Sequence, residues 1–228
     1  MTTQLSVIIP VLNELEIINH TLDILTRLPG ADECEFIIVD GNPSQNTIKA
    51  ISNSRVIKLH TQPGRGIQMN RGAAAATGRG LLFLHADTQI PENGLEQVIE
   101  TLTDETIVGG AFELGIDAAG FAYRLIEYVA SARNRLTRIP FGDQGIFMKR
   151  DYFKKIGGYK TVPIMEDVDL MRRAKKDGQN IRILRAKVQT SPRRWRNEGI
   201  LFCTLRNWTL QFFYGLGVSP SILARFYR

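Results

Sequence analysis

Short apolar runs alternate with segments of helical periodicity along the first half of the chain. The runs are nearly continuous, as in strands buried on both faces of a sheet. They lie at residues 5–9, 36–39, 56–59 and 81–84. Helices are expected between and after them, at residues 18–25, 44–52, 66–76 and 94–102. Short strands separated by helices predict crossover connections and a mostly parallel sheet flanked by helices.

In the second half of the chain strand and helix patterns alternate less regularly, but both are still present. We expect strands at 108–114 and 146–149 and helices at 121–135 and 167–176, with Gly178 capping the last one. No repeat or linker interrupts this pattern. We therefore predict one α/β domain over residues 1–196 and a helical C-terminal appendage over 197–228.

The appendage contains an amphipathic pattern. Four large apolar residues recur at helical spacing, namely Leu201, Leu205, Trp208 and Phe212. Thr204, Asn207 and Gln211 form a polar stripe between them. The apolar face is expected to be covered, by the catalytic core, by a second subunit or by a membrane surface. In the last case Arg206, Arg225 and Arg228 would flank it.

The composition is that of a folded, soluble protein. Hydrophobic residues make up 43% and charged residues 23%, which excludes wholesale disorder. Cys34 and Cys203 are too few for a disulfide framework or a four-cysteine zinc site. The first residues do not resemble a signal peptide, and no apolar run reaches the length of about 18 residues that a spanning helix needs. We predict a cytoplasmic protein with free thiols and leave contact with the inner face of a membrane open.

The net charge of +6 is concentrated in one region. Residues 150–196 carry 14 Lys/Arg and 5 Asp/Glu, while the rest of the chain carries 15 and 18. This favours a local anionic partner, such as phosphate groups or an acidic membrane, although a solvated basic face explains it equally well. Basic and aromatic residues interleave only at 193–196, so we expect no nucleic-acid partner.

Polar residues follow three of the predicted strands where each strand ends. In an open parallel sheet, ligands bind beyond the carboxyl ends of the strands. The residues at these ends are Asn13, Glu14, Asp40, His85 and Asp87. Such an edge suits Mg²⁺ or Mn²⁺, or the donor groups of a base and a ribose. A strand-end aspartate is also a common helix cap, and for Asp40 both interpretations stay open.

Five segments together resemble the ordered motifs of family-2 glycosyltransferases. They are SVIIPVLNE, IIVDG, LLFLHADT, GIFMKRDYFKKIGGY and MEDVDLMRRAKKDG. The resemblance covers about residues 4–190. It implies a GT-A fold, in which a Rossmann-like nucleotide half joins an acceptor half. It also implies a nucleotide-sugar donor, an acceptor hydroxyl and a divalent metal.

The resemblance assigns roles to individual residues of this chain. Pro10, Asn13 and Glu14 match the segment along the base and ribose, and Asp40 matches the carboxylate that contacts the base. Asp87 matches the acid that holds the metal on the diphosphate. Asp167 matches the catalytic base of inverting members.

His85 departs from the family pattern, which has an aspartate there. Residues i and i+2 of an extended segment share a side, so His85 and Asp87 can face one ligand. Imidazole binds Mn²⁺ but suits Mg²⁺ poorly, which leaves the identity of the metal open. The alternative is that His85 only packs or caps.

Three further segments carry candidate binding residues. Arg65 precedes a helix in a glycine-rich turn, where it can bind phosphate or ribose oxygens or simply lie at the surface. Asp143 and Gln144 lie where family members line the acceptor pocket, and Glu166 precedes Asp167. All three are acceptor-binding candidates, although capping or the helix dipole also favours acids at such positions. Arg194 is a candidate diphosphate contact.

The predicted function is that of a metal-dependent, inverting glycosyltransferase with Asp167 as base. One alternative is a nucleotide-sugar-binding protein that has lost turnover through the change at His85. A nucleotidyltransferase is less favoured. It would carry a glycine- and lysine-rich loop directly after the first strand, where this chain has Val-Leu-Asn-Glu.

Overall fold

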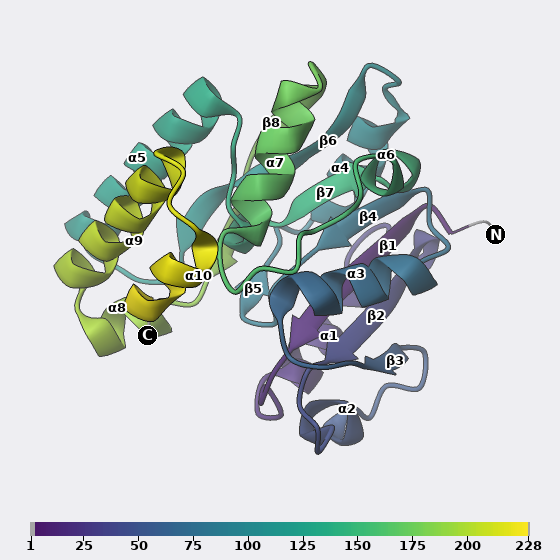
Figure 1. Cartoon of the computed structure of the whole chain (residues 1–228). Coiled ribbons are helices and arrows are strands. Elements are labelled where there is room, and N and C mark those ends of the chain that lie inside the picture. Colours follow the sequence, from purple (N-terminus) through teal and green to yellow (C-terminus); the bar gives the residue numbers. More distant parts are fainter. Residues whose placement is uncertain (1–2, 228) are drawn as a thin grey trace.

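Four parallel strands form one side of a mixed sheet in the computed structural model, which describes residues 3–227. β1 (Leu5–Val11) lies between β2 (Cys34–Asp40) and β4 (Gly80–Phe83), and β3 (Ile57–His60) forms the edge beside β2. All three pairings are parallel, which confirms the crossover connections predicted from the apolar runs (Figure 1).

The other side of the sheet mixes strand directions. β7 (Ile146–Lys149) runs antiparallel between β4 and β6 (Ile107–Ile116). β8 (Asn180–Thr190) pairs in parallel with β6, and β5 (Thr88–Gln89) closes the edge antiparallel to β8. Neither β5 nor β8 was predicted. Exposed basic residues interrupt β8 at Arg182, Arg185 and Lys187, so it lacks the apolar run that marks the buried strands.

Helices cover both faces of the sheet, since successive side chains of a strand point to opposite sides. α1 (Ile18–Leu25) and α4 (Gly94–Thr103) pack on one face, and α3 (Arg65–Ala75), α6 (Arg150–Lys155) and α7 (Glu166–Lys176) on the other. The shorter elements are α2 (Asn46–Ala50), α10 (Pro220–Leu223), η1 (Ala31–Glu33), η2 (Gly142–Gln144) and η3 (Ala224–Phe226). The predicted α/β architecture is confirmed.

The C-terminal segment is helical, as predicted. It comprises α8 (Arg193–Glu198), α9 (Ile200–Gly215), α10 and η3. The predicted boundary after residue 196 falls inside α8. Arg228, one of the predicted flanking arginines, lies outside the described residues. Among the described helices, none combines the length and hydrophobicity that crossing a membrane requires.

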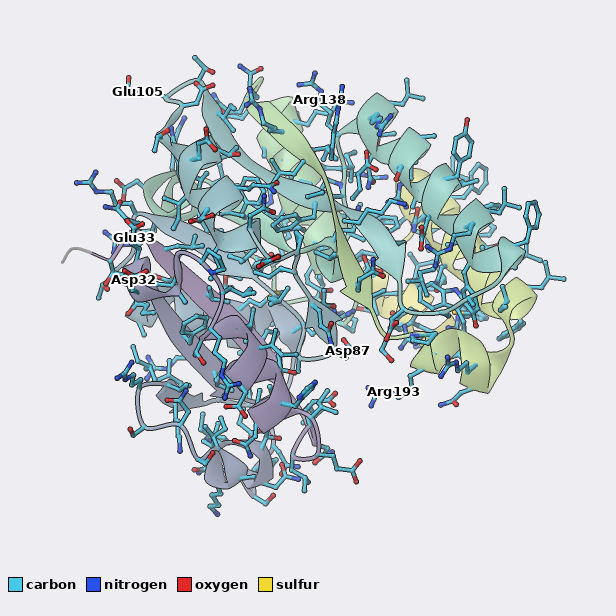
Figure 2. All side chains as sticks on the ribbon, turned by 180° about the vertical axis from the view of Figure 1, so that it is seen from behind. Asp32, Glu33, Asp87, Glu105, Arg138 and Arg193 are labelled. Atoms are coloured by element: carbon cyan, nitrogen blue, oxygen red, sulfur yellow. The ribbon has the colours of Figure 1, made fainter. Side chains whose placement is uncertain are left out.

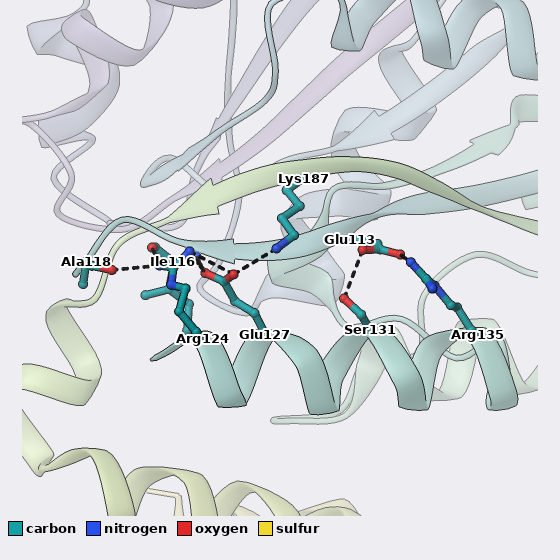
Figure 3. A network of polar contacts seen from close by, with 8 residues as sticks. All are labelled: Glu113, Ile116, Ala118, Arg124, Glu127, Ser131, Arg135 and Lys187. Carbon is teal, nitrogen blue, oxygen red and sulfur yellow. Dashed lines mark hydrogen bonds and ion pairs between the residues drawn. The ribbon is translucent and has the colours of Figure 1, made fainter. Parts of the chain in front are cut away.

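α5 (Phe121–Thr137) turns a largely polar face to the sheet. Its buried positions are Tyr123, Glu127, Ser131 and Asn134. Glu127 accepts a hydrogen bond from the Ile116 N–H at 2.8 Å and forms ion pairs with Arg124 and Lys187 (Figure 3). Ser131 and Arg135 bind Glu113 of β6. These contacts fix which side of α5 faces the sheet.

α9 turns its apolar stripe away from the core, which was one of the three coverings that the sequence left open. Leu201, Leu205, Trp208 and Phe212 are 73%, 50%, 47% and 64% exposed. The predicted polar stripe faces the protein instead, because that side of α9 borders a polar cavity. Core packing of the apolar stripe is therefore wrong for the described chain.

Candidate active site

A cavity of about 750 Å³ opens beyond the carboxyl ends of β1 and β4. At this point successive parallel strands change the side on which they are added to the sheet: β2 and β3 lie on one side of β1, and β4 lies on the other. Crevices at such switch points are the usual ligand sites of open α/β sheets, and this volume suits a nucleotide-sized ligand. The first turns of α3 and α7, the loop around η2 and the C-terminal helices complete the wall.

Most of the predicted site residues line this one cavity. They are Pro10, Glu14, Arg65, His85, Asp87, Asp143 and Asp167. Residues from the ends of β1 and β4 thus meet at one cavity, whereas Asp40, at the end of β2, does not line it.

Asp167, in the first turn of α7, accepts hydrogen bonds from two backbone N–H groups. Gly142 donates to its Oδ2 at 2.6 Å and Val168 donates to its Oδ1 at 2.7 Å. Each carboxylate oxygen keeps a further lone pair. Met165, the residue just before α7, adopts a left-handed conformation with φ of 67°, which is unfavourable for this side chain. Such strain is typical of functional sites.

Asp143 and His85 lie close to Asp167. A Cβ placed on Gly142 would lie 3.3 Å from both the Asp167 carboxylate and His85 Nε2. Burial, followed by the charge of Asp167, raises the pKa of Asp143 to about 6. Burial, followed by the charges of Arg65 and Arg194, lowers the pKa of His85 to about 3. At neutral pH the cavity thus presents ionised Asp143 beside a neutral imidazole.

We expect Asp143→Asn to stabilise the fold at high pH. The folded-state pKa lies about 2 units above that of a free aspartate, so ionised Asp143 costs up to about 3 kcal/mol. Urea unfolding at pH 8 should show the variant about 1–3 kcal/mol more stable. The difference should shrink as the pH falls through 6 and vanish near 4, where wild-type Asp143 is protonated. An advantage independent of pH would contradict this explanation.

Glu166, which the sequence predicted as an acceptor contact, does not line the cavity. It is 2% exposed, and its Oε1 lies 2.8 Å from Nε of Arg65. Burial raises the pKa of Glu166 to about 7, although Arg65 opposes the shift. Arg65 does line the cavity. Glu166 therefore holds Arg65 in place from behind.

Two arginines of the C-terminal segment also reach the cavity. Arg193 Nη2 lies 3.5 Å from Glu14 Oε1 and 4.0 Å from Asp87 Oδ2 (Figure 2). Arg194 donates a hydrogen bond to Tyr227, which also contacts Arg65. Sequence reasoning suggested Arg194 but missed Arg193 and Tyr227. The charge concentration within residues 150–196 was the available signal for Arg193.

Asp40 and Asn13 lie outside the cavity. Asp40 is fully buried and accepts N–H groups of Asn42, Thr47 and Ile48 at 2.8–3.2 Å. These are the capping contacts that the sequence left open as the alternative. Asn13 Oδ1 accepts hydrogen bonds from Asn42 and Asn46 and so joins two loops.

Gln144, which the sequence also predicted as an acceptor contact, does not line the cavity. It is fully buried, donates to the Phe112 carbonyl at 3.0 Å and accepts from the Phe141 N–H at 3.0 Å. Gln68 was missed: it lines the cavity and donates at 2.8 Å to the carbonyls of Val11 and Val39. This bond pair joins the ends of β1 and β2.

The protein supplies few metal donors of its own. Within residues 3–227 there is no group of three or more His, Cys, Asp or Glu side chains arranged to hold an ion. Asp87 and His85 both face the cavity, and the Asp143 Oδ1 atom is buried without a hydrogen-bond partner among the described residues. A carboxylate beside a neutral imidazole fits a divalent cation whose other ligands come from a substrate.

Known proteins of similar sequence and structure act in glycosyl transfer. Two relatives, each a "PGL/p-HBAD biosynthesis glycosyltransferase", come from Mycobacterium bovis and Mycobacterium tuberculosis. Each is 35% identical over 95 residues, and the match covers 38% of this chain and 36% of the relative. This chain thus matches about a third of their length.

The fold is similar to that of the mannosyltransferase PcManGT from Pyrobaculum calidifontis, solved in complex with GDP-Man and Mn²⁺. The TM-score is 0.65 at 19% identity, covering 84% of this chain and 57% of that one. This likeness supports the predicted GT-A, Rossmann-like fold. The model of the family named Glycosyl transferase family 2 matches residues 6–157, about two thirds of the chain. The chain therefore belongs to glycosyltransferase family 2.

Proposed function

We propose that this chain transfers a sugar from a nucleoside diphosphate sugar to an acceptor hydroxyl by a single displacement. One observation carries the proposal: Asp87 and Asp167 face the same cavity together with Arg65, Arg193 and Arg194. Membership of glycosyltransferase family 2 supports the reaction class. The GDP-Man bound to the structural neighbour supports the donor class.

The cavity residues match the two demands of this reaction. The acceptor oxygen bonds to the anomeric carbon while the bond from that carbon to the diphosphate oxygen breaks, and the electron pair leaves with the diphosphate. The acceptor proton goes to Asp167, whose carboxylate is already held by Gly142 and Val168. The arginines supply positive charge where the diphosphate charge grows. Attack opposite the leaving group inverts the anomeric configuration.

Asp87 and His85 are the residues that would hold a divalent metal, Mn²⁺ or Mg²⁺. When bound there, the ion would add positive charge next to the diphosphate oxygens. The neutral imidazole favours Mn²⁺ over Mg²⁺. The Mn²⁺ in the complex of the structural neighbour supports this choice.

We expect Asp87→Asn to weaken donor binding at least about tenfold and to abolish stabilisation by Mn²⁺. A neutral amide is a poorer ligand for a hard cation, and a contact to a charged group contributes about 1.5–3 kcal/mol. Thermal unfolding with nucleotide sugars, with and without Mn²⁺, measures both effects. Asp23→Asn, at an exposed position on α1, is the matched control and should behave as wild type. Equal donor binding by wild type and Asp87→Asn in excess Mn²⁺ would count against this role.

A further inference from the structure

α5 and α9 both turn apolar side chains to solvent. On α5, Phe121, Leu125, Tyr128 and Leu136 are between 50% and 84% exposed. On α9 the exposed stripe comprises Leu201, Leu205, Trp208, Phe212 and Leu216. The two helices lie side by side at one end of the molecule (Figures 1 and 2). We call these nine side chains the α5–α9 face. Monomeric soluble proteins rarely expose so many large apolar residues together.

The polar contacts on the inner sides of both helices keep this face directed outward. Glu127 of α5 is 2% exposed and ion-paired with Arg124 and Lys187. Asn207 and Gln211 of α9 line the cavity. Rotating α5 to bury its apolar stripe would separate Glu127 from Arg124 and Lys187, and separating a buried acid from its cations is strongly destabilising. The outward apolar face is therefore built into the fold.

The unpaired charge carried by the helices of the α5–α9 face is positive. Arg124 and Arg135 pair with Glu127 and Glu113, and Arg193 and Arg194 line the cavity. The exposed arginines of α8, of η3 and of the residue after α5 that form no ion pair within the described residues are Arg138, Arg196 and Arg225. The described parts of α5, α8, α9, α10 and η3 contain two acids, Glu127 and Glu198, and both are ion-paired. The partner of this face must therefore combine an apolar interior with negative charge.

A second copy of this chain fits that requirement poorly. A two-fold contact brings the same patch of both subunits together, so arginines would face arginines without exposed acids to pair with them. An anionic lipid surface offers both properties at once. Trp208 and Tyr128 also suit the boundary between headgroups and acyl chains. We propose that the α5–α9 face docks the protein on an anionic membrane surface as a peripheral contact. Docking is independent of the proposed sugar transfer.

Co-sedimentation of the full chain with vesicles tests this proposal, without donor or metal. The protein should pellet with vesicles of phosphatidylcholine mixed with phosphatidylglycerol, and high salt should weaken this binding. Trp208→Ser combined with Phe212→Ser should weaken it at least about tenfold, through lost apolar burial. Arg196→Gln and Arg225→Gln should each weaken it about fivefold. Ile57→Ser, on edge strand β3, is the matched control and should bind as wild type.

The variants carry changes at exposed positions, so their unfolding temperatures should match that of the wild type. Absence of binding to the mixed vesicles would overturn the proposal. So would binding that the Trp208 and Phe212 changes leave unaltered. A dimer in sedimentation equilibrium that these changes dissociate, with no vesicle binding, would assign the face to a second copy instead.

Discussion

Asp167→Asn is expected to lower the rate of sugar transfer at least about 10²-fold while leaving donor affinity nearly unchanged. The asparagine fits the same space but cannot accept the proton of the acceptor hydroxyl, and loss of a general base costs about 10²–10⁴-fold. Gly142 and Val168 donate to different oxygens of Asp167, so the single amide oxygen of the variant can keep one of these two hydrogen bonds, which still holds the side chain at the start of α7. Initial rates of transfer and calorimetric titration with the donor measure the two quantities.

Asp169→Asn is the matched control for this variant. Asp169 lies in the same first turn of α7 but forms ion pairs with Lys160 and Arg173 instead of facing the cavity. Its replacement should reduce stability, because Asp169 is 7% exposed and its loss leaves Lys160 and Arg173 without their acid. Turnover should stay within about twofold of the wild type, because Asp169 does not line the cavity. Persistent turnover in Asp167→Asn, with loss in Asp143→Asn, would move the base to Asp143. A product of retained anomeric configuration would exclude single displacement.

Arg65→Met is expected to lower kcat/KM about 10²–10³-fold, the usual effect of removing one donor from a site of developing charge. The change also leaves Glu166 buried without its cation. Because burial already raises the pKa of Glu166 to about 7, the acid will stay protonated to a higher pH in the variant. The loss of stability should therefore grow as the pH rises above 7. Transfer rates and urea unfolding at pH 6 and pH 9 test both statements.

Arg65→Lys should recover little of this activity. Arg65 binds Glu166 through Nε and has two further side-chain nitrogens on the side of the cavity. Lysine has a single side-chain nitrogen, which cannot serve both sides. Arg71→Met is the matched control, because Arg71 is an exposed arginine of the same helix. Full activity in Arg65→Lys would mean that a single charge suffices and that the geometry set by Glu166 is unimportant.

The buried strands were predictable because a strand that is buried on both faces has a nearly continuous run of apolar residues in the sequence. The runs that became β1, β2 and β4 are apolar at nearly every inward position on both faces of the sheet, with Ser6 as the buried exception in the first run. β8 was not predictable in this way, since its exposed side carries Arg182, Arg185 and Lys187. Its place in the sheet depends on pairing with β6, which is remote in sequence.

The site was predictable as a set of strand ends, but not as contacts. The topology rule brought Glu14, His85 and Asp87 to one cavity. It could not distinguish Asp40, which caps backbone amides, from Asp87, which faces the cavity. Periodicity also located the two faces of α9 without telling which one points inward. That choice depends on the polar cavity against which the helix packs.

Calorimetric titration of the full chain with a panel of nucleoside diphosphate sugars in the presence of Mn²⁺ tests the central claim most directly. The cavity and its acids and arginines predict that at least one donor binds, that the nucleoside diphosphate alone competes with it, and that Asp87→Asn binds at least about tenfold more weakly. If no nucleotide sugar binds, with or without Mn²⁺, the assignment of this cavity to a sugar donor is contradicted.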